Sequence, residues 1–211
     1  MTHTPQVPDR TSAAGARHRQ RAAAELHVSC IRGGFLPTLG QGFLEVVYRC
    51  IDEHPHCVLL TESIDGQVVG FVSGTTGRSS LRRVLGLHPF RAAAALAPSL
   101  LSIGRLKGIA KVAGYSGRRD EQAQSWPRAE LLSIAVHPDH RGKGVAERLF
   151  RQLEQAFGEL GVGHFRVVVG ANLAPALSFY RKMGCEEKGR ITLHGAANSM
   201  ILARRVGEAT Q

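Results

Sequence analysis

The chain has 211 residues, 43% hydrophobic content and a formal net charge of +10 at pH 7. This length and composition suffice to bury one sizeable core, and we expect a single domain at residues 17–211 rather than two small ones. No stretch approaches the roughly twenty apolar residues of a membrane span, and the N-terminus lacks the apolar block of a secretory signal, so we expect a cytoplasmic protein.

The cysteine pattern argues against a disulfide framework. Four scattered thiols without a Cys-x-x-Cys pair are typical of a reducing compartment. His54, His56 and Cys57 lie close in sequence, but because no second cluster of ligands accompanies them we interpret them as a polar loop before a strand and expect no metal. The four cysteines are Cys30, Cys50, Cys57 and Cys185.

The N-terminal part of the chain predicts an arm followed by two helices. Residues 1–16 are rich in Thr, Pro, Ala and Gly and show no apolar periodicity, which predicts a disordered arm. Residues 17–27 favour a first helix, and apolar spacing over residues 43–51 predicts a second one.

Two short apolar runs then predict a hairpin. Residues 57–62 and 67–73 flank the dipeptide Asp65-Gly66. Such a dipeptide favours a tight turn between antiparallel strands.

A basic insert follows the hairpin. Residues 77–119 contain nine of the 27 Lys and Arg residues and no Asp or Glu, so nearly all of the excess positive charge belongs to this segment. Apolar residues alternate with the basic ones and predict short amphipathic helices, interrupted near Pro89, Pro98 and Gly104.

The most informative segment runs from an apolar strand into a glycine-containing loop and a helix. After the run at residues 131–136 come Gly142 and Gly144, which lack a Cβ and let backbone N–H groups approach a ligand closely. The first turn of the following helix carries unpaired N–H groups and partial positive charge, and Arg141 and Lys143 add to it. We therefore expect a site for an anion, most simply a diphosphate.

The helix predicted at residues 145–160 has apolar residues at helical spacing, and its Glu147 and Arg151 are placed for an i,i+4 ion pair. The β-branched run at residues 165–169 then predicts a strand. With the strand at residues 130–136 it forms a β-α-β unit, whose two strands are parallel and hold their ligand at the carboxyl ends.

The loop matches one family of phosphate-binding loops better than others. It lacks the Walker A pattern, and Glu147 stands where a dinucleotide fingerprint needs a small residue. The pattern Arg141-x-x-Gly144-x-Ala146 resembles the Arg/Gln-x-x-Gly-x-Gly/Ala signature of the GNAT superfamily of acetyl-CoA-dependent N-acetyltransferases.

A second segment carries the same resemblance. Asn172, Ala176, Tyr180 and Gly184 follow the family's Asn…Ala-x-x-Phe/Leu-Tyr-x-x-x-Gly-Phe helix. Two departures are visible: Asn172 precedes Ala176 by four residues instead of three, and Cys185 stands where Phe is common.

The resemblance implies an α/β (α+β) fold with a mixed sheet of about six to seven strands flanked by helices, completed by strands at residues 189–194 and 199–205. It also implies a splayed parallel strand pair that holds acyl-CoA along the strand ending at Val136. The implied cofactor contacts are Ile134, Ala135, Val136, Arg141, Gly142, Lys143, Gly144, Val145, Ala146 and Asn172.

Two residues are candidates for proton transfer. By resemblance Glu130 is the general base, with His137 or a water chain as substitutes, although a surface carboxylate at a strand end fits the sequence equally well. The resemblance implies that Tyr180 is the general acid that protonates the departing thiolate. The alternative is that its ring only packs in the core. Asn172 either contacts the cofactor or is the N-cap of the helix that follows it. Pro175 is favoured at a first helical position, which would instead make Ala174 the N-cap.

The resemblance implies transfer of an acetyl group from acetyl-CoA, as cosubstrate, to a primary amine by direct attack in a ternary complex, because no cysteine has a motif that suggests a nucleophile. We expect a small-molecule acceptor such as an amino sugar. The alternatives are a protein N-terminal or lysine acetyltransferase and a non-catalytic acyl-CoA-binding module. The basic insert favours an anionic acceptor or an acidic protein or membrane surface, unless it is only a solvated face. Nucleic acid is not expected, because aromatic residues make up only 6% and no recognised motif accompanies the charge.

Overall fold

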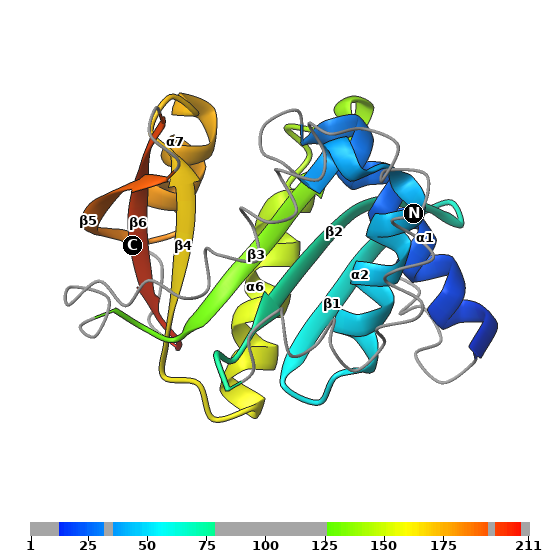
Figure 1. Cartoon of the computed structure of the whole chain (residues 1–211), viewed down its shortest axis with the longest axis horizontal. Coiled ribbons are helices and arrows are strands. Elements are labelled where there is room, and N and C mark those ends of the chain that lie inside the picture. The colour runs from blue at the N-terminus through cyan, green and yellow to red at the C-terminus, as the bar shows by residue number, and fades with distance from the viewer. Residues whose placement is uncertain (1–12, 32–35, 79–125, 194–196, 208–211) are drawn as a thin grey trace.

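The computed structural model describes residues 13–31, 36–78, 126–193 and 197–207 (Figure 1). Apart from Gly77 and Arg78, the predicted basic insert lies outside the described residues, as do residues 1–12 of the predicted arm. The elements are α1 (Ala13–Cys30), the 3-10 helix η1 (Leu36–Leu39), α2 (Gln41–Glu53), β1 (Cys57–Ile64), β2 (Gln67–Thr75), β3 (Ala129–Val136), the 3-10 helix η3 (Pro138–His140), α6 (Val145–Glu159), β4 (His164–Gly170), α7 (Ala174–Lys182), β5 (Glu186–Leu193) and β6 (Ala197–Arg205).

The strands form one six-stranded mixed sheet in the order β1-β2-β3-β4-β6-β5. The pair β3 and β4 is parallel, and the other neighbouring pairs are antiparallel. Asp65 and Gly66 both have positive φ between β1 and β2, which confirms the predicted hairpin. The fold class expected from the sequence is therefore confirmed.

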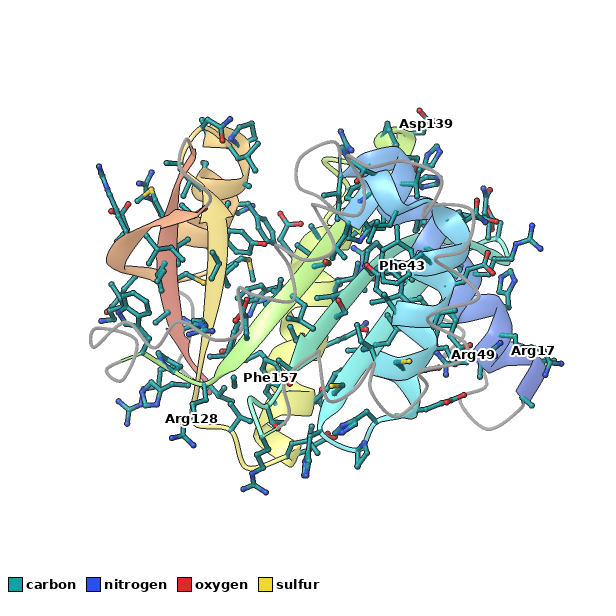
Figure 2. The ribbon with its side chains drawn as sticks, in the orientation of Figure 1. Arg17, Phe43, Arg49, Arg128, Asp139 and Phe157 are labelled. Atoms are coloured by element: carbon teal, nitrogen blue, oxygen red, sulfur yellow. The ribbon has the colours of Figure 1, made fainter. Side chains whose placement is uncertain are left out.

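Helices cover both faces of the sheet. In Figure 1, α1 and α2 lie in front of β1 and β2, and α6 lies behind the sheet. Figure 2 labels Phe43 on the α2 side and Phe157 on α6. Phe43 belongs to a buried cluster with Phe71 of β2, whereas Phe157 belongs to a second cluster with Phe165 of β4. The sheet thus separates two apolar layers.

Two glycines of β2 let α6 approach the sheet closely. A Cβ at Gly74 would stand 2.7 Å from Cζ of Phe157, and a Cβ at Gly70 would stand 2.9 Å from Cδ1 of Leu149. Both distances are shorter than carbon atoms tolerate, so any larger residue would push the helix away. This packing fixes α6, and with it the loop that precedes the helix, against the sheet.

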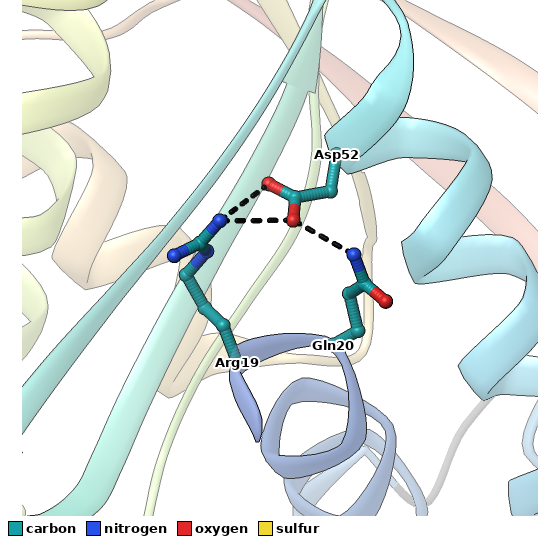
Figure 3. Close-up of polar contacts among 3 residues, drawn as sticks. All are labelled: Arg19, Gln20 and Asp52. Carbon is teal, nitrogen blue, oxygen red and sulfur yellow. Dashed lines mark hydrogen bonds and ion pairs between the residues drawn. The ribbon is translucent and has the colours of Figure 1, made fainter. Parts of the chain in front are cut away.

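A buried ion pair joins α1 to α2 (Figure 3). Nη2 of Arg19 donates to both carboxylate oxygens of Asp52, at 3.3 and 3.0 Å, and Nε2 of Gln20 donates to Oδ2 at 2.9 Å. The Arg19 and Asp52 side chains are only 10% and 12% exposed. Removing either partner would leave a buried charge without compensation.

Several element boundaries differ from the sequence prediction. Helix α1 begins at Ala13, so residues 13–16 are helical and not part of an arm; alanine, which forms three of these four positions, has the highest helix propensity. Strand β5 begins at Glu186, three residues early, because its pairing with β6 continues across an irregularity at Lys188. None of the helices within the described residues combines the length and apolar character that a bilayer crossing requires.

The substitution Gly74→Ala tests the close approach of α6. We expect a loss of about 1–3 kcal/mol in the free energy of unfolding, because the added methyl group overlaps Phe157. Chemical denaturation measures the loss. Gly163→Ala is the matched control, since a Cβ there meets no atom within 4 Å. Equal midpoints for the two variants would contradict the packing argument.

Candidate active site

The candidate site is the gap between β3 and β4. These strands pair over only three rungs, Ala129–Phe165, Glu130–Arg166 and Leu131–Val167. Beyond them β3 continues to Val136 while β4 diverges, as Figure 1 shows. The facing edges of the two strands therefore have backbone N–H and C=O groups that are not paired with each other.

A bulge on the other edge of β3 lies where the gap opens. Ser73 of β2 pairs with Ser133, and the next residue, Gly74, pairs with Leu131. Leu132 is therefore an extra residue on β3. A bulge of this kind bends its strand and increases the local twist, which is consistent with β3 turning away from β4 at this point.

The predicted anion loop follows the end of β3 at the wide end of the gap. Asp139 of η3 marks this end in Figure 2, and Arg128 marks the narrow end. Gly142 and Gly144 have φ values of 72° and 75°, a conformation that residues with a Cβ rarely adopt, and Gly144 caps α6. Among the described residues, none accepts a backbone hydrogen bond from residues 142–146 outside the helix. Backbone N–H groups at a helix N-terminus are of the kind that can bind an anion.

The two basic residues of the loop have different surroundings. Nε of Arg141 donates to the carbonyl oxygen of Val136 at 3.1 Å, so this side chain ties the loop to the end of β3. Lys143 is exposed and forms no ion pair with any described residue. Arg148 donates to the Lys143 carbonyl at 3.1 Å and pairs with Glu62 of β1. Neither Arg141 nor Lys143 forms an ion pair with a described carboxylate, so both keep their positive charge unpaired beside the loop.

The expected i,i+4 pair between Glu147 and Arg151 is not formed. Glu147 instead accepts a hydrogen bond at 3.1 Å from Nζ of Lys182 on α7. A bond from its own backbone N–H is the main reason that the pKa of this carboxyl is lowered, and Lys182 adds to the effect. The tertiary contact between helices competes with the local pair and joins α6 to α7 across the wide end of the gap.

Glu130 has a partner that the sequence did not reveal. Nε and Nη2 of Arg166 both donate to its Oε2, at 2.9 and 2.7 Å. The two residues face each other on one rung of the parallel pair, one rung before pairing stops. No described residue donates to the other oxygen, Oε1. The pair thus fixes the narrow end of the gap and leaves one carboxylate oxygen for another donor.

The second predicted motif lies across the gap, at the end of β4. Asn172 is exposed, and its Oδ1 lies 2.9 Å from the position that a Cβ on Gly170 would take. Helix α7 is capped by Leu173 through its backbone alone, not by Asn172 or by Ala174. The expected cap is therefore wrong, because the helix takes in Ala174 before Pro175 and places the proline in its first turn.

Tyr180 is buried on α7 against Phe150 and Phe179. Burial raises the pKa of its hydroxyl, so the phenol is fully protonated at neutral pH. Among the described residues, none hydrogen-bonds to this hydroxyl. Burial also raises the pKa of the nearby Cys185 thiol to about 12, which makes a nucleophilic thiolate unfavourable there.

A buried series of hydrogen-bonded side chains on the face of β3 toward α1 and α2 was not predicted from the sequence. Nδ1 of His27 on α1 lies 2.5 Å from the hydroxyl of Tyr48 on α2, and this hydroxyl also bonds the Ser133 side chain. Both rings pack against Phe71. The series connects α1 and α2 to β3 beside the bulge. Only the position of His27 on the apolar side of its helix could have indicated it.

No group of three or more His, Cys, Asp or Glu within the described part of the chain is placed to hold a metal ion. His54 accepts a hydrogen bond from the backbone N–H of His56 at 3.1 Å, and His137 lies 3.7 Å from Asp139 beside η3.

Comparison with known proteins decides the family. Residues 31–185 match the model of the acetyltransferase (GNAT) family. The chain belongs to this family, whose members use acetyl-CoA. A streptothricin acetyltransferase from Streptomyces lavendulae is 40% identical over 57 residues, which is 27% of this chain and only 30% of that protein's length.

Solved structures of GNAT proteins share the fold. The N-acetyltransferase from Staphylococcus aureus Mu50 has a TM-score of 0.58 at 13% identity, over 90% of this chain and 94% of that one. Ard1 from Thermoplasma volcanium has a TM-score of 0.57 at 15% identity, over 91% and 94%. The Escherichia coli ribosomal-protein-S18-alanine N-acetyltransferase has a TM-score of 0.53 at 14% identity, over 94% and 92%. At identities of 13–15%, these comparisons show that this chain and the three proteins share a fold.

The buried His27 predicts a pH-dependent stability. Burial lowers its pKa from 6.5 to about 4. In the unfolded chain the His27 imidazole is therefore protonated below pH 6.5, whereas in the folded chain it stays neutral until about pH 4. We expect the free energy of unfolding to be unaffected by this group above pH 7 and to fall by up to about 3 kcal/mol between pH 6.5 and 4. Urea denaturation of wild type and His27→Gln measures it; equal slopes against pH would contradict the assignment.

Proposed function

We propose that this chain is an acetyl-CoA-dependent N-acetyltransferase that acts on the primary amine of a small molecule. The observation that carries the proposal is the gap itself: pairing of β3 and β4 stops after three rungs, and beyond the end of β3 the N-terminus of α6 has backbone N–H groups without a backbone acceptor among the described residues. An extended ligand arm can add to an open strand edge through backbone hydrogen bonds, and a diphosphate can bind the helix N-terminus.

The residues at the gap fit acetyl-CoA. Gly142 has open space where a Cβ would stand, and at Gly144 only the end of the Arg148 side chain is near. A diphosphate can therefore reach the backbone N–H groups of residues 142–146, with Lys143 beside it. The backbone of residues 134–136 holds the pantetheine arm, and Asn172 stands across the gap to contact it. Acetyl-CoA supplies the acetyl group as an activated thioester.

Glu130 and Tyr180 carry out the two proton transfers of the reaction. As the acceptor nitrogen bonds to the acetyl carbon and the C–S bond breaks, the nitrogen loses a proton, and the sulfur must gain one. Glu130, anchored by Arg166 through one oxygen, takes the amine proton on its other oxygen, directly or through water. Tyr180, whose phenol is protonated at neutral pH, donates its proton toward the sulfur. The gap places thioester and amine together, which supplies a large part of the rate.

The proposal of a small-molecule acceptor is supported by the relative from Streptomyces lavendulae, which is named streptothricin acetyltransferase. Because that match spans 30% of the relative's length, it supports an amine of low molecular weight as acceptor and not streptothricin itself. The high pKa of buried Cys185 argues against an acyl-enzyme at this thiol.

Tyr180→Phe tests the proposed acid. We expect kcat for release of free thiol from acetyl-CoA to fall by about 100-fold, a typical effect of losing a general acid, while the Kd for CoA stays nearly unchanged because the ring is retained. Stopped thiol assays give kcat, and calorimetry gives the Kd. Folded wild-type chain that binds no CoA would overturn the whole proposal, and an unchanged kcat would remove Tyr180 from it.

Glu130→Gln and Arg166→Gln separate a base from a structural pair. If Glu130 accepts the proton, Glu130→Gln lowers kcat by about 100-fold or more, whereas Arg166→Gln keeps the carboxylate and lowers kcat far less. The double variant should resemble Glu130→Gln alone. Equal losses in the two single variants would show instead that the pair only fixes the strands.

A further inference from the structure

Glu62 is a carboxylate in an otherwise apolar row of side chains on β1, the edge strand of the sheet. Two positions away on either side, Leu60 belongs to the buried cluster that includes α6, and Ile64 packs against that cluster. Glu62 pairs with Gly70, where a Cβ would meet Leu149 of α6, so the Glu62 side chain points to the face that α6 covers. A charge in such a row loses hydration and needs a partner to compensate it.

Arg148 of α6 is the partner of this carboxylate. Its Nε and Nη2 both lie 2.6 Å from Oε1 of Glu62. The Glu62 side chain is only 15% exposed, and its Oε2 is buried without a hydrogen-bond partner among the described residues. The carboxylate therefore depends on one guanidinium group and in turn fixes where that group lies.

The third nitrogen of the guanidinium connects the pair to the glycine-containing loop. Nη1 of Arg148 donates to the carbonyl oxygen of Lys143 at 3.1 Å, and it stands 3.1 Å from the position that a Cβ on Gly144 would take. A guanidinium is planar and rigid, so a carboxylate that binds Nε and Nη2 also sets the position of Nη1. Through Arg148, Glu62 of the edge strand thus reaches the backbone of the loop.

The bond to Lys143 fixes the direction of the next amide group. The peptide between Lys143 and Gly144 is trans and planar, so its C=O and its N–H point in opposite directions. Because the carbonyl is bound by Arg148, the N–H of Gly144 points away from Arg148, and no described residue accepts a hydrogen bond from it. Gly144 has a φ of 75°, and glycine adopts many other backbone conformations at little cost. A tertiary contact is therefore needed to hold this peptide in one orientation.

We propose that Glu62 is a positioning residue of the cofactor site: it acts through Arg148 and orients the N–H of Gly144 toward the diphosphate of CoA. This inference rests on the proposed function for the identity of the ligand, but the orientation of the amide is measurable without any ligand. An inward-pointing charge on an edge strand can instead serve only to prevent pairing with another chain. In that role neither the Gly144 amide nor the affinity for CoA depends on Glu62.

The affinity for CoA separates positioning from simple electrostatics, because the two predict opposite signs. CoA is an anion, so the loss of a nearby carboxylate strengthens its binding if charge alone matters. We expect instead that Glu62→Ala and Arg148→Ala each raise the Kd for CoA about threefold to tenfold, the effect of one hydrogen bond. Because Glu62 acts through Arg148, the double variant should match Arg148→Ala alone. Calorimetry at physiological salt measures the Kd.

The amide itself is observed by NMR of the 15N-labelled chain. We expect Glu62→Ala and Arg148→Ala to shift the Gly144 amide resonance in the free protein. Arg151→Ala is the matched control, because it removes an exposed positive charge from the same helix; it should leave this resonance in place and change the Kd for CoA little, since salt screens exposed charges. Glu62→Gln keeps the shape of the side chain without a buried charge, and it replaces any alanine variant that does not fold.

Three results would overturn the inference: an unchanged or lower Kd for CoA in the Glu62 variants, additive effects in the double variant, or a Gly144 resonance that does not respond. If the wild-type chain binds CoA and the Glu62 variants bind it equally well, this inference alone fails. If the Gly144 resonance responds to both variants but the folded wild-type chain binds no CoA, Glu62 still orients the amide and the proposed function fails.

Discussion

The site depends on the point at which hydrogen bonding between β3 and β4 stops. In a continuous parallel pair the facing N–H and C=O groups of both strands would be consumed by each other. Here pairing ends at the Leu131–Val167 rung, the bulge at Leu132 lies beside that rung, and the Glu130–Arg166 pair lies one rung before it. An open strand edge is ordinarily a liability that invites unwanted pairing. In the proposed function, this open edge of β3 accepts the extended arm of the cofactor.

Packing far from the gap keeps its wide end in place. Helix α6 is held against β2 by the space at Gly70 and Gly74, and its N-terminus carries the anion loop. Arg141 ties the loop to the last carbonyl of β3, and Glu147 joins α6 to α7 through Lys182. These contacts fix the orientation of the backbone N–H groups of the loop, and in the proposed function this reduces the conformational entropy lost when a ligand binds.

The two sides of the sheet differ: one has buried polar contacts and the other has a hollow at its surface. The α1 and α2 side carries a buried ion pair, Arg19 with Asp52, and the series from His27 through Tyr48 to Ser133. The rings of His27 and Tyr48 pack against Phe71, so the hydrogen bonds of this series specify one arrangement of the helices over β3. The β5 and β6 side instead keeps a hollow at its surface, next to the narrow end of the gap. In the proposed function, the cofactor and the proton carriers meet around the pair of strands β3 and β4.

The sequence by itself determined the order and type of the described α-helices and strands and the position of the glycine-containing loop before α6. These depend on local properties: apolar period, the dipeptide Asp65-Gly66, and the two glycines that precede α6, each of which limits the backbone regardless of distant residues. It did not determine which side chains meet. The bond between Glu147 and Lys182, the pairing of Glu130 with Arg166 and the contact of His27 with Tyr48 join residues 21 to 36 positions apart. Only the tertiary structure decided them, because strand register and helix packing bring such residues together and no local pattern records those distances.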